Sequence, residues 1–475
     1  MTHSRDIYLL SPKALSPETI AVAFAKTSRS PESFRAIAAE LSDEKSAQFH
    51  EKWVVGYGHA SVAEHAVLHI AVENVSRLAI ECLESNRLAS YTEKSTRYQL
   101  WGTDSFYTPH EIAASGLGSL YRESVTSLFS AYHRSLEPVR RLMQAKYPRK
   151  DGESEARWDG RIRSKYVDCC RFLLPAASLA NVGVTANARV LESAIRKLLS
   201  HSLAEVREIG TEVKAVAQTE VPTLLKYAEG VAYQCETAAA LTRAAGGVLQ
   251  AGPAPAAGVQ LVDYDAAAEQ KFLAACLYRF GGSALAECRA AVEHMTPEQR
   301  TALAHEALGR LGRYDVPLRE LEHITYTFDA LMDQGGYFEI KRHRMMTQSP
   351  QRLTCQLGYA VPRAIDEAGV RADYDDAMQN AADAYRRLSA DFPEEASYVV
   401  PNGFNRRVLL TLNLREAFHL CELRGAATAH FSVRHTAGQI FELISRVHPL
   451  LAGYMRCRDN PNWRVIEQEF FSATA

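Results

Sequence analysis

The sequence predicts an α+β protein in which two diverged copies of one domain follow each other along 475 residues. Motifs recur in the same order in both halves, and alternating apolar runs typical of strands stand between segments with the i, i+3, i+4 spacing of helices. A stretch rich in Ala, Pro and Gly at 248–258 interrupts this pattern near the midpoint. We therefore expect a first copy over 1–240 and a second over 241–475.

Each copy is expected to open with a short apolar strand and a helix, over 6–25 and over 259–278. An acidic residue and a histidine then precede an alternating apolar run that predicts a further strand. These pairs are Glu64-His65, before the run 66–72, and Glu322-His323, before the run 324–328. About twenty residues later each copy has a polar or basic triplet, Ser85-Asn86-Arg87 in the first and Arg342-His343-Arg344 in the second.

A third pair of marks follows. Pro175 and Pro401 each stand twelve residues before an Asn-x-Arg sequence, at Asn187 and at Asn413. The first copy has about thirty extra residues between its triplet and its proline, within 104–160. That insertion is rich in charge, which predicts an exposed helix and loop.

Composition excludes several classes of protein. The chain is 47% hydrophobic and 23% charged, and 54 Lys+Arg balance 56 Asp+Glu to a net charge of −2, so nothing draws it as a whole to nucleic acid or to a membrane. No run of about 20 apolar residues is found, and the first ten residues lack the layout of a leader. The nine cysteines form no CxxC pair, so we expect reduced, mostly buried thiols, no metal site and a cytoplasmic protein.

The second half carries the denser cationic cluster. Arg342, His343 and Arg344 suit the oxygens of a phosphate or pyrophosphate, although three basic residues in a row are also typical of a solvated surface. On the expected helix downstream, Asn413 and Arg424 are about three turns apart and share a face, so they could line one groove. Arg415 and His419 lie between them.

The first half offers a different set, within SYTEKSTRY at 90–98. Ser90, Glu93, Ser95 and Arg97 alternate in what we expect to be a loop, where hydroxyls and a guanidinium can hold phosphate oxygens and the carboxylate can accept from a hydroxyl or a ring N–H. The same pattern also fits a polar turn that caps a helix.

These segments resemble the signature of the flavin-dependent thymidylate synthases, whose motif runs Arg-His-Arg, seven residues, then Ser. In the first half the resemblance rests on GHASVAEH at 58–65 and on the segment 76–98. In the second half it rests on LEHITYTF, KRHRMM and LNLREAFHLCELR, at 321–328, 341–346 and 412–424. The similarity covers most of both halves.

The resemblance implies two tandem copies of that fold, each a mainly antiparallel sheet packed with helices. Members of the family are homotetramers whose sites take residues from several subunits and bind FAD, dUMP and methylenetetrahydrofolate, with NADPH as reductant. No enzyme cysteine attacks the pyrimidine in this family, so Cys82 and Cys355 are expected to be structural.

Carried over residue by residue, the first copy keeps the positions that hold the nucleotide and loses those that hold the flavin. The triplet retains only its last arginine, and the late arginine that the family places against the uracil ring is Leu198. Arg196 and Lys197 are near, but their directions on the helix make neither an easy substitute. The expected substrate-binding residues are Arg87, Ser90, Glu93, Ser95, Arg97 and Arg171.

The second copy departs in the complementary way. Its nucleotide loop has Thr347, Pro350, Arg352 and Thr354, and Ser397 stands where the first copy has Arg171. It keeps the late arginine, Arg424, as the expected catalytic residue that stabilises the ionised pyrimidine. The expected cofactor-binding residues are Glu322, Arg342, His343, Arg344, Asn413, Arg415 and His419.

This complementarity predicts hybrid sites, with a flavin-binding wall from one copy and a nucleotide-binding loop from the other, within one chain or between two. A homodimer would then form a four-domain core with two working sites. The leading interpretation is FAD-dependent C5 methylation of a uracil nucleotide, dUMP to dTMP. Two alternatives remain: a flavoenzyme with another pyrimidine or secondary-metabolite acceptor, and a non-catalytic nucleotide-binding or scaffold homologue.

Overall fold

A computed structural model describes residues 6, 8–28, 30–56, 60–249, 258–459 and 462–472. They fall into two compact units, each of which is discontinuous in sequence. Unit 1 comprises Met1–Lys94 and Ser178–Ala251, and unit 2 comprises Ser95–Ala177 and Gly252–Ala475. The 1–240 and 241–475 division stays a prediction about the repeats. The units follow packing instead, because 95–177 from the first half belongs to unit 2.

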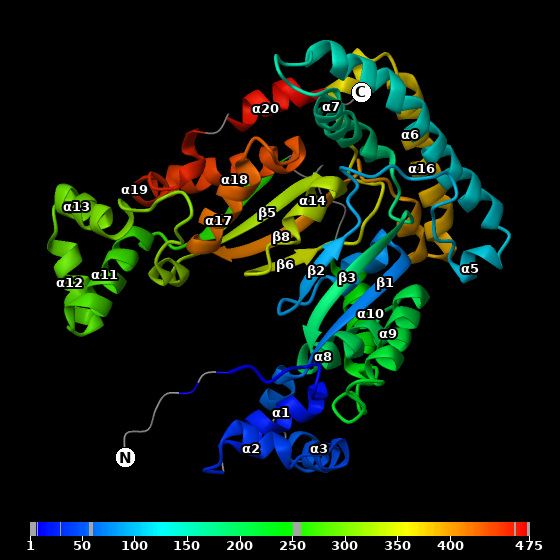
Figure 1. Cartoon of the computed structure of the whole chain (residues 1–475). Helices are drawn as coiled ribbons and strands as arrows, with labels where there is room; N and C mark the ends of the chain where they lie inside the picture. The colour runs from blue at the N-terminus through cyan, green and yellow to red at the C-terminus, as the bar shows by residue number, and fades with distance from the viewer. Residues whose placement is uncertain are drawn as a thin grey trace. The chain divides into compact units, whose positions relative to one another are not determined.

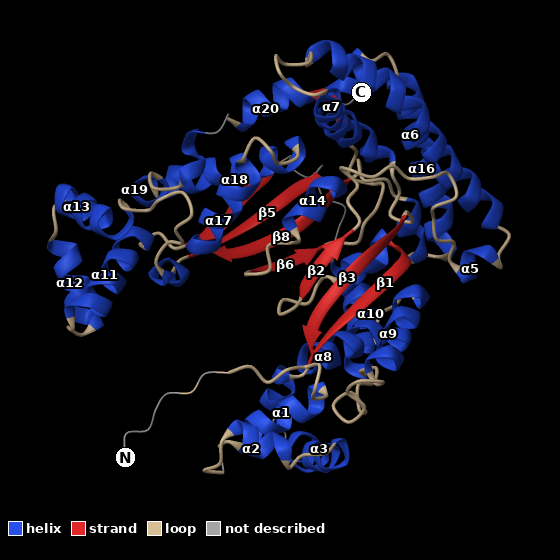
Figure 2. Cartoon of the chain, viewed as in Figure 1, coloured by secondary structure: helices blue, strands red, loops and turns tan. Residues whose placement is uncertain are grey.

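Unit 1 has a three-stranded antiparallel sheet of order β1-β3-β2 (Figures 1 and 2). The strands are β1 (Val67–Ser76), β2 (Ser90–Glu93) and β3 (Leu179–Asn187). The helices are α1 (Pro17–Lys26), α2 (Phe34–Ala39), α3 (Asp43–His50), α4 (Arg77–Leu83), α8 (Ala188–Leu199), α9 (Ala204–Ala217) and α10 (Ala232–Val248). Short helical turns are η1 (Glu51–Gly56) and η2 (Ala60–His65).

Unit 2 has a four-stranded antiparallel sheet of order β4-β5-β8-β6 and a short β7-β9 pair. The strands are β4 (Val259–Tyr264), β5 (Thr325–Asp333), β6 (Met346–Pro350), β7 (Val361–Pro362), β8 (Asn405–Asn413) and β9 (Phe471–Ser472). The first-half helices are α5 (His110–Ala113), α6 (Gly118–Lys146) and α7 (Glu155–Cys170), with η3 (Arg171–Leu173). The others are α11 (Ala268–Gly281), α12 (Leu285–His294), α13 (Pro297–Leu308), α14 (Gln334–Ile340), α15 (Arg363–Glu367), α16 (Arg371–Asp391), α17 (Leu414–Gly425), α18 (Phe431–Val447), α19 (Pro449–Ala452) and α20 (Trp463–Phe470), with η4 (Arg319–His323), η5 (Glu395–Val399) and η6 (Arg456–Asp459).

The strands and helices confirm the predicted repeat. β3 and β8 have the same alternating burial along nine residues, and each leads into a twelve-residue helix, α8 or α17. Asn187 and Asn413 cap these helices, each accepting from the backbone N–H three residues on, at 3.0 and 2.9 Å. The expected strands at 66–72 and 324–328 are β1 and β5, and both pair antiparallel with the strand that carries the asparagine.

The N-caps of α4 and α14 also reflect the duplication. In each unit a hydroxyl residue and an acidic residue pair at the cap, but the residue that caps the helix in one unit is the partner in the other. In unit 1, Ser76 caps α4 and donates its N–H and hydroxyl to Glu205, at 2.7 and 2.6 Å. In unit 2, Asp333 caps α14, and its carboxylate accepts from the Ser432 hydroxyl. Burial raises the pKa of Asp333. The acid–hydroxyl pair is kept while the two residues trade places, as expected where each would otherwise leave a buried polar group unsatisfied.

Two sequence expectations were wrong. The apolar strand expected near 6–10 is absent from the part of that segment that the structure describes, where Tyr8–Leu10 have no strand pairing, although the helix after it is α1. The insertion at 104–160 forms the expected helix and loop, but its helix, α6, is not exposed as a whole. α6 contacts α7 and α16, and Leu128, Phe129 and Tyr132 on it are fully buried. Its charged residues cover one face of a helix whose other face is core.

Backbone hydrogen bonds join the two copies inside unit 2 at their prolines. Pro175 and Pro401 form an antiparallel bridge. Ala176 N donates to Val400 O at 2.9 Å, and Asn402 N donates to Leu174 O at 3.0 Å. These two bonds exchange equivalent positions of the copies, so the bridge is a local twofold contact of the kind seen in isologous dimers.

The buried face of α6 can be tested by truncation. Phe129→Ala should lower the free energy of unfolding by about 3–5 kcal/mol, because a fully buried phenyl ring leaves a cavity. Urea denaturation followed by circular dichroism measures this loss. Glu123→Ala, at an exposed position of the same helix, should change stability by less than about 0.5 kcal/mol. Equal, small effects for both variants would restore the exposed-insertion interpretation.

Candidate functional site

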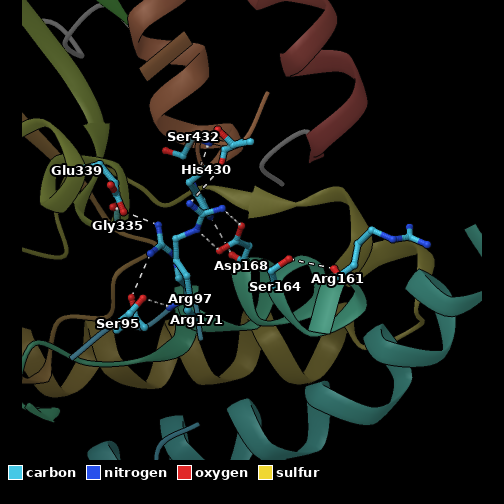
Figure 3. Close-up of polar contacts among 12 residues, drawn as sticks. Ser95, Arg97, Arg161, Ser164, Asp168, Arg171, Gly335, Glu339, His430 and Ser432 are labelled. Atoms are coloured by element: carbon cyan, nitrogen blue, oxygen red, sulfur yellow. Dashed lines mark hydrogen bonds and ion pairs between the residues drawn. The ribbon is translucent and has the colours of Figure 1, made fainter. Parts of the chain in front are cut away.

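Arg97 and Arg171 of the first half lie in unit 2, beside residues of the second half. Arg97 donates from Nε and Nη2 to the two carboxylate oxygens of Asp168, at 2.9 and 2.8 Å, and from Nη1 to Thr428 O at 3.3 Å. The bidentate pairing fixes the plane of the guanidinium. Figure 3 shows Arg97 turned toward Asp168 and Arg171 turned toward Gly335.

Arg171 is buried, and both its guanidinium and its backbone carbonyl make hydrogen bonds with residues of the second copy. Nη1 donates to Thr96 Oγ1 at 3.1 Å, and Nη2 lies 3.4 Å from Gly335 O, at the start of α14. The Arg171 carbonyl accepts from Asn402 Nδ2 at 3.0 Å. A charged side chain at this depth needs such partners, because its burial would otherwise be costly.

His430 of the second half also contacts the first half, at Asp168. Its Nε2 lies 3.1 Å from Asp168 O, and its Nδ1 accepts from Ser432 N at 3.2 Å, so Nε2 carries the proton and donates. Burial, with the nearby charge of Arg171, holds the pKa of His430 well below its usual range. His430 is therefore a neutral donor that positions Asp168.

Arg424 stands in a chain of polar contacts on the second-half side. Its Nε donates to His343 Nε2 at 2.9 Å, and His343 Nδ1 lies 2.7 Å from Glu416 Oε1. Since Nε2 accepts, the proton is on Nδ1 and is donated to Glu416. Burial lowers the pKa of His343 despite Glu416, which agrees with a neutral ring. The central histidine of the triplet thus orients Arg424.

Glu339 on α14 is the ion-pair partner of Arg424. Arg424 Nη1 donates to Glu339 Oε2 at 2.8 Å. Burial by itself raises the pKa of Glu339, but the guanidiniums of Arg171, Arg342, Arg424 and Arg97 outweigh it and hold the pKa below its usual value. We call Glu339 and these four arginines the hybrid cluster, because two of the arginines come from the first half and two from the second.

A cavity of about 190 Å³ in unit 2 gathers four of the expected cofactor residues. Arg415 lines it and donates from Nη1 to Glu322 Oε1 at 2.7 Å and from Nε to Pro317 O at 3.0 Å. Hydrogen bonds from Arg319 and Arg415 lower the pKa of Glu322. Arg424 is not among the residues that line this cavity, so Asn413 and Arg424 do not share it. Its predicted members are Glu322, Asn413, Arg415 and His419.

The expected nucleotide loop at 90–98 divides between the units. Ser90 to Glu93 form strand β2 in unit 1, where Ser90 is exposed and Glu93 makes a buried ion pair with Arg77 at 3.1 Å. Ser95 belongs to unit 2, and its Oγ accepts from Arg97 N at 3.2 Å in a turn. Arg87 is exposed in unit 1. Of the predicted substrate-binding set, Arg97 and Arg171 join the hybrid cluster.

Lys197 contacts the triplet of the first copy, although its direction on the helix suggested that it could not replace the late arginine. Its Nζ lies 2.5 Å from Ser85 Oγ and 2.8 Å from Asn86 Oδ1, the residues that stand in place of the first arginine and the histidine. Burial lowers the pKa of Lys197. The Lys197–Asn86 contact parallels Arg424–His343, because a long flexible side chain offsets one residue of helical rotation.

The cysteines agree with the expectation of mostly buried thiols, since six of the nine are buried and all are free. Burial raises the pKa of Cys355 and, to about 12, that of Cys170. Cys82 lies in unit 1, 3.3 Å from His201 Nε2. Among the described residues, no helix combines the length and apolarity that a membrane crossing needs.

Sequence reasoning missed Asp168, Glu339, Glu416 and His430. Glu416 follows the Asn-x-Arg mark, and Glu339 precedes the basic triplet by three residues, so both were close to recognised motifs. Asp168 stands three residues before Arg171, one helical turn away. A spacing of three residues from a predicted residue was the signal that could have found Asp168, Glu339 and Glu416, whereas His430 had no such signal.

The comparisons with known proteins agree with this duplicated architecture. The family described as thymidylate synthase complementing protein matches residues 10–223 and 260–450. A "UPF0159 protein" of Chlamydia muridarum is 31% identical over 438 residues, covering 88% of this chain and 82% of the relative. A UPF0159 protein of Thermoplasma acidophilum is 27% identical over 462 residues, covering 89% and 91%.

Single-copy relatives and a solved structure carry the enzyme's name. A flavin-dependent thymidylate synthase of Clostridium tetani is 28% identical over 213 residues, covering 44% of this chain and 82% of the relative. The flavin-dependent thymidylate synthase ThyX of Helicobacter pylori, solved with FAD and dUMP, aligns at 17% identity with a TM-score of 0.31, covering 42% of this chain and 99% of that one.

The fold and its cationic sites define an α+β protein of two tandem, diverged copies. The chain belongs to the thymidylate synthase complementing protein family, the flavin-dependent thymidylate synthases, and the two matched regions are its two copies. Membership supports an enzyme of this type. The hybrid cluster is therefore a candidate for the active site of such an enzyme.

The buried histidines predict loss of stability in acid. His430 and His343 have folded-state pKa values below the usual value, so protons bind the unfolded chain first as the pH falls through about 6.5. The free energy of unfolding should fall between pH 7 and 5, by up to about 1.4 kcal/mol per pH unit for each such group. In denaturant titrations, His430→Asn should flatten this slope, and exposed His294→Asn should leave it unchanged. Equal slopes in all three proteins would contradict the neutral buried ring.

Proposed function

We propose that the protein is a flavin-dependent enzyme that transfers a one-carbon unit to C5 of a uracil nucleotide, dUMP by default, at a site built from both copies. The observation that carries this proposal is the contact of the two copies around α14: Arg97 and Arg171 of the first copy donate to Thr428 O and Gly335 O of the second, and Arg424 donates to Glu339 on α14. The charges of these three arginines and of Arg342 together lower the pKa of Glu339. Each copy alone supplies two of the four guanidiniums.

Arg97 and Arg171 suit the phosphate of the nucleotide. Both are already directed by protein partners, Asp168 and Thr96, so they are preorganised before a ligand binds. Ser95 of unit 2 is a further proposed contact, and the roles of Ser90, Glu93 and Arg87 stay predictions from the sequence. A charge-assisted contact to phosphate is worth about 1.5–3 kcal/mol, so a site with Ser397 and Thr354 at the two arginine positions should bind its nucleotide poorly.

Arg424 is the proposed catalytic residue. Its guanidinium would stabilise the negative charge that develops on the pyrimidine, an effect that is larger in a pocket shielded from water. His343 accepts from its Nε and Glu416 holds the ring, so the direction of Arg424 is fixed by two further side chains. His343 and Glu416 are in this sense positioning residues.

The residues present suit part of a flavin dinucleotide. Arg415, His419 and Asn413 provide hydrogen-bonding groups around the 190 Å³ cavity, and Glu322 provides an acceptor. That volume is below the roughly 300–1,000 Å³ of a complete site for a drug-sized ligand, so it suits one portion of FAD, with Arg342 and Arg344 toward the phosphates. When bound, the reduced flavin supplies the hydride. Methylenetetrahydrofolate and NADPH are the proposed co-substrates.

A second candidate function keeps the flavin and changes the acceptor to another pyrimidine nucleotide or a secondary metabolite. Two observations favour it. The loop around Thr347, Pro350, Arg352 and Thr354 departs from the nucleotide loop of the first copy, and a carboxylate stands inside the cationic cluster. A scaffold without flavin is the remaining outcome of the same experiment.

The proposed function predicts a response to the nucleotide. Titration of dUMP into the flavin-loaded protein should shift the visible flavin band, and Arg97→Ala or Arg424→Ala should weaken the apparent affinity about tenfold or more. Arg352→Ala serves as a matched control, because that arginine pairs with Glu394 and not with the cluster. If the flavin band does not change when dUMP is added, the result favours the second candidate function. If the protein does not bind FAD, the result favours a scaffold without flavin.

The proposed function also predicts how the chains assemble. We propose a cytoplasmic homodimer with a four-domain core, by analogy with the four subunits of single-copy relatives. Sedimentation equilibrium should then give about twice the chain mass of 52.7 kDa. A protein that is wholly monomeric at micromolar concentration would contradict the proposed homodimer. If that monomer binds flavin and dUMP fully, one chain is enough to form the site.

A further inference from the structure

Glu339 is the one negatively charged residue of the hybrid cluster, so it would repel an anionic ligand. Its carboxylate pairs with Arg424 at 2.8 Å, and both side chains are largely shielded, at 12% and 15% exposure. The surrounding guanidiniums keep it ionised at neutral pH. The carboxylate therefore occupies the position at Arg424 in which a phosphate oxygen could pair with the guanidinium.

The other carboxylates nearby have different partners. Asp168 is held by both nitrogens of Arg97 and by its own place on α7, and Glu416 accepts from His343. Glu339 is in the last turn of α14, and its ion-pair partner is Arg424, at 2.8 Å.

The carboxylate is a feature of the second copy. Aligning Asn86 with His343 places Cys82 at the position of Glu339, so the first copy has no charge there. The acid therefore accompanies the arginine-rich triplet and the late arginine, the features that only the second copy has kept.

We propose that Glu339 is the internal counter-ion of the hybrid cluster, and that a phosphate-bearing ligand binds by displacing its carboxylate from Arg424. The inference rests on the proposed function, since it identifies the cluster with the nucleotide site. Only a ligand with an anionic group, such as a phosphate monoester, can replace the lost ion pair. Because breaking that pair costs part of the binding free energy, Glu339 lowers the affinity of the cluster for phosphate-bearing ligands and leaves its affinity for the uncharged nucleoside unchanged.

Inorganic phosphate is the probe that tests this directly. Glu339→Gln keeps the size of the side chain and removes its charge, so phosphate should bind the variant about tenfold or more tightly than the unaltered protein in calorimetric titration. The variant should also melt at a lower temperature in phosphate-free buffer, because four guanidiniums then repel one another, and phosphate should restore most of the loss. Equal phosphate affinity in the two proteins would overturn the proposal.

Two further variants keep the test decisive. Glu306→Gln makes the same change in net charge at an exposed pair with Arg310 and should leave phosphate binding unchanged. If Glu339→Gln folds only in the presence of phosphate, that rescue supports the proposal. If it does not fold at all, Glu339→Asp, which withdraws the carboxylate by one methylene, should still bind phosphate more tightly, and no gain overturns the proposal.

The nucleotide separates this inference from the proposed function. A gain in phosphate affinity without any response of the flavin band to dUMP would leave the counter-ion in place and remove the uracil nucleotide as substrate. A flavin response to dUMP that is unchanged in Glu339→Gln would keep the function and remove the counter-ion. Deoxyuridine should bind the two proteins equally, because it carries no phosphate.

Discussion

The antiparallel bridge between Pro175 and Pro401 is the contact on which the candidate site depends. Paired backbone hydrogen bonds join equivalent segments of the two copies within unit 2. Arg171 lies four residues before Pro175, and its carbonyl accepts from Asn402, the residue after the second proline. The bridge therefore fixes a first-copy guanidinium against the start of α14. A local twofold contact of this kind needs no side-chain specificity, so the surrounding residues were free to diverge.

Divergence has made the copies unequal in chemistry while their folds stayed alike. The cap of each central helix, the burial of each central strand and the acid–hydroxyl pair are preserved, and these are features that stability requires. The basic triplet, the late arginine and the two arginines proposed to bind phosphate are each kept in one copy. Charged groups that serve no ligand cost desolvation when buried, which gives a physical reason to lose them where the site is incomplete.

The repeat, the central strands and the capped helices could be predicted, because period-two burial and Asn caps are local signals. The absence of a strand at Tyr8–Leu10 and the buried face of α6 could not be predicted, because sheet pairing and the environment of a helix depend on distant residues such as those of α16. Within the site, Arg97, Arg171, His343 and Arg424 were recognised from motifs. Glu339 was not, since its role comes only from the arginines that folding gathers around it.

The central claim is that residues of both copies act on one another in a single cluster. Carboxyl titration by NMR of protein labelled at the glutamate side chains tests it most directly, with the Glu339 signal assigned by its loss in Glu339→Gln. Replacing a first-copy arginine, in Arg171→Gln or Arg97→Gln, should raise the pKa of Glu339, because each guanidinium helps to hold it down. Unchanged titration of Glu339 in both variants would show that the first copy does not reach it and would contradict the account.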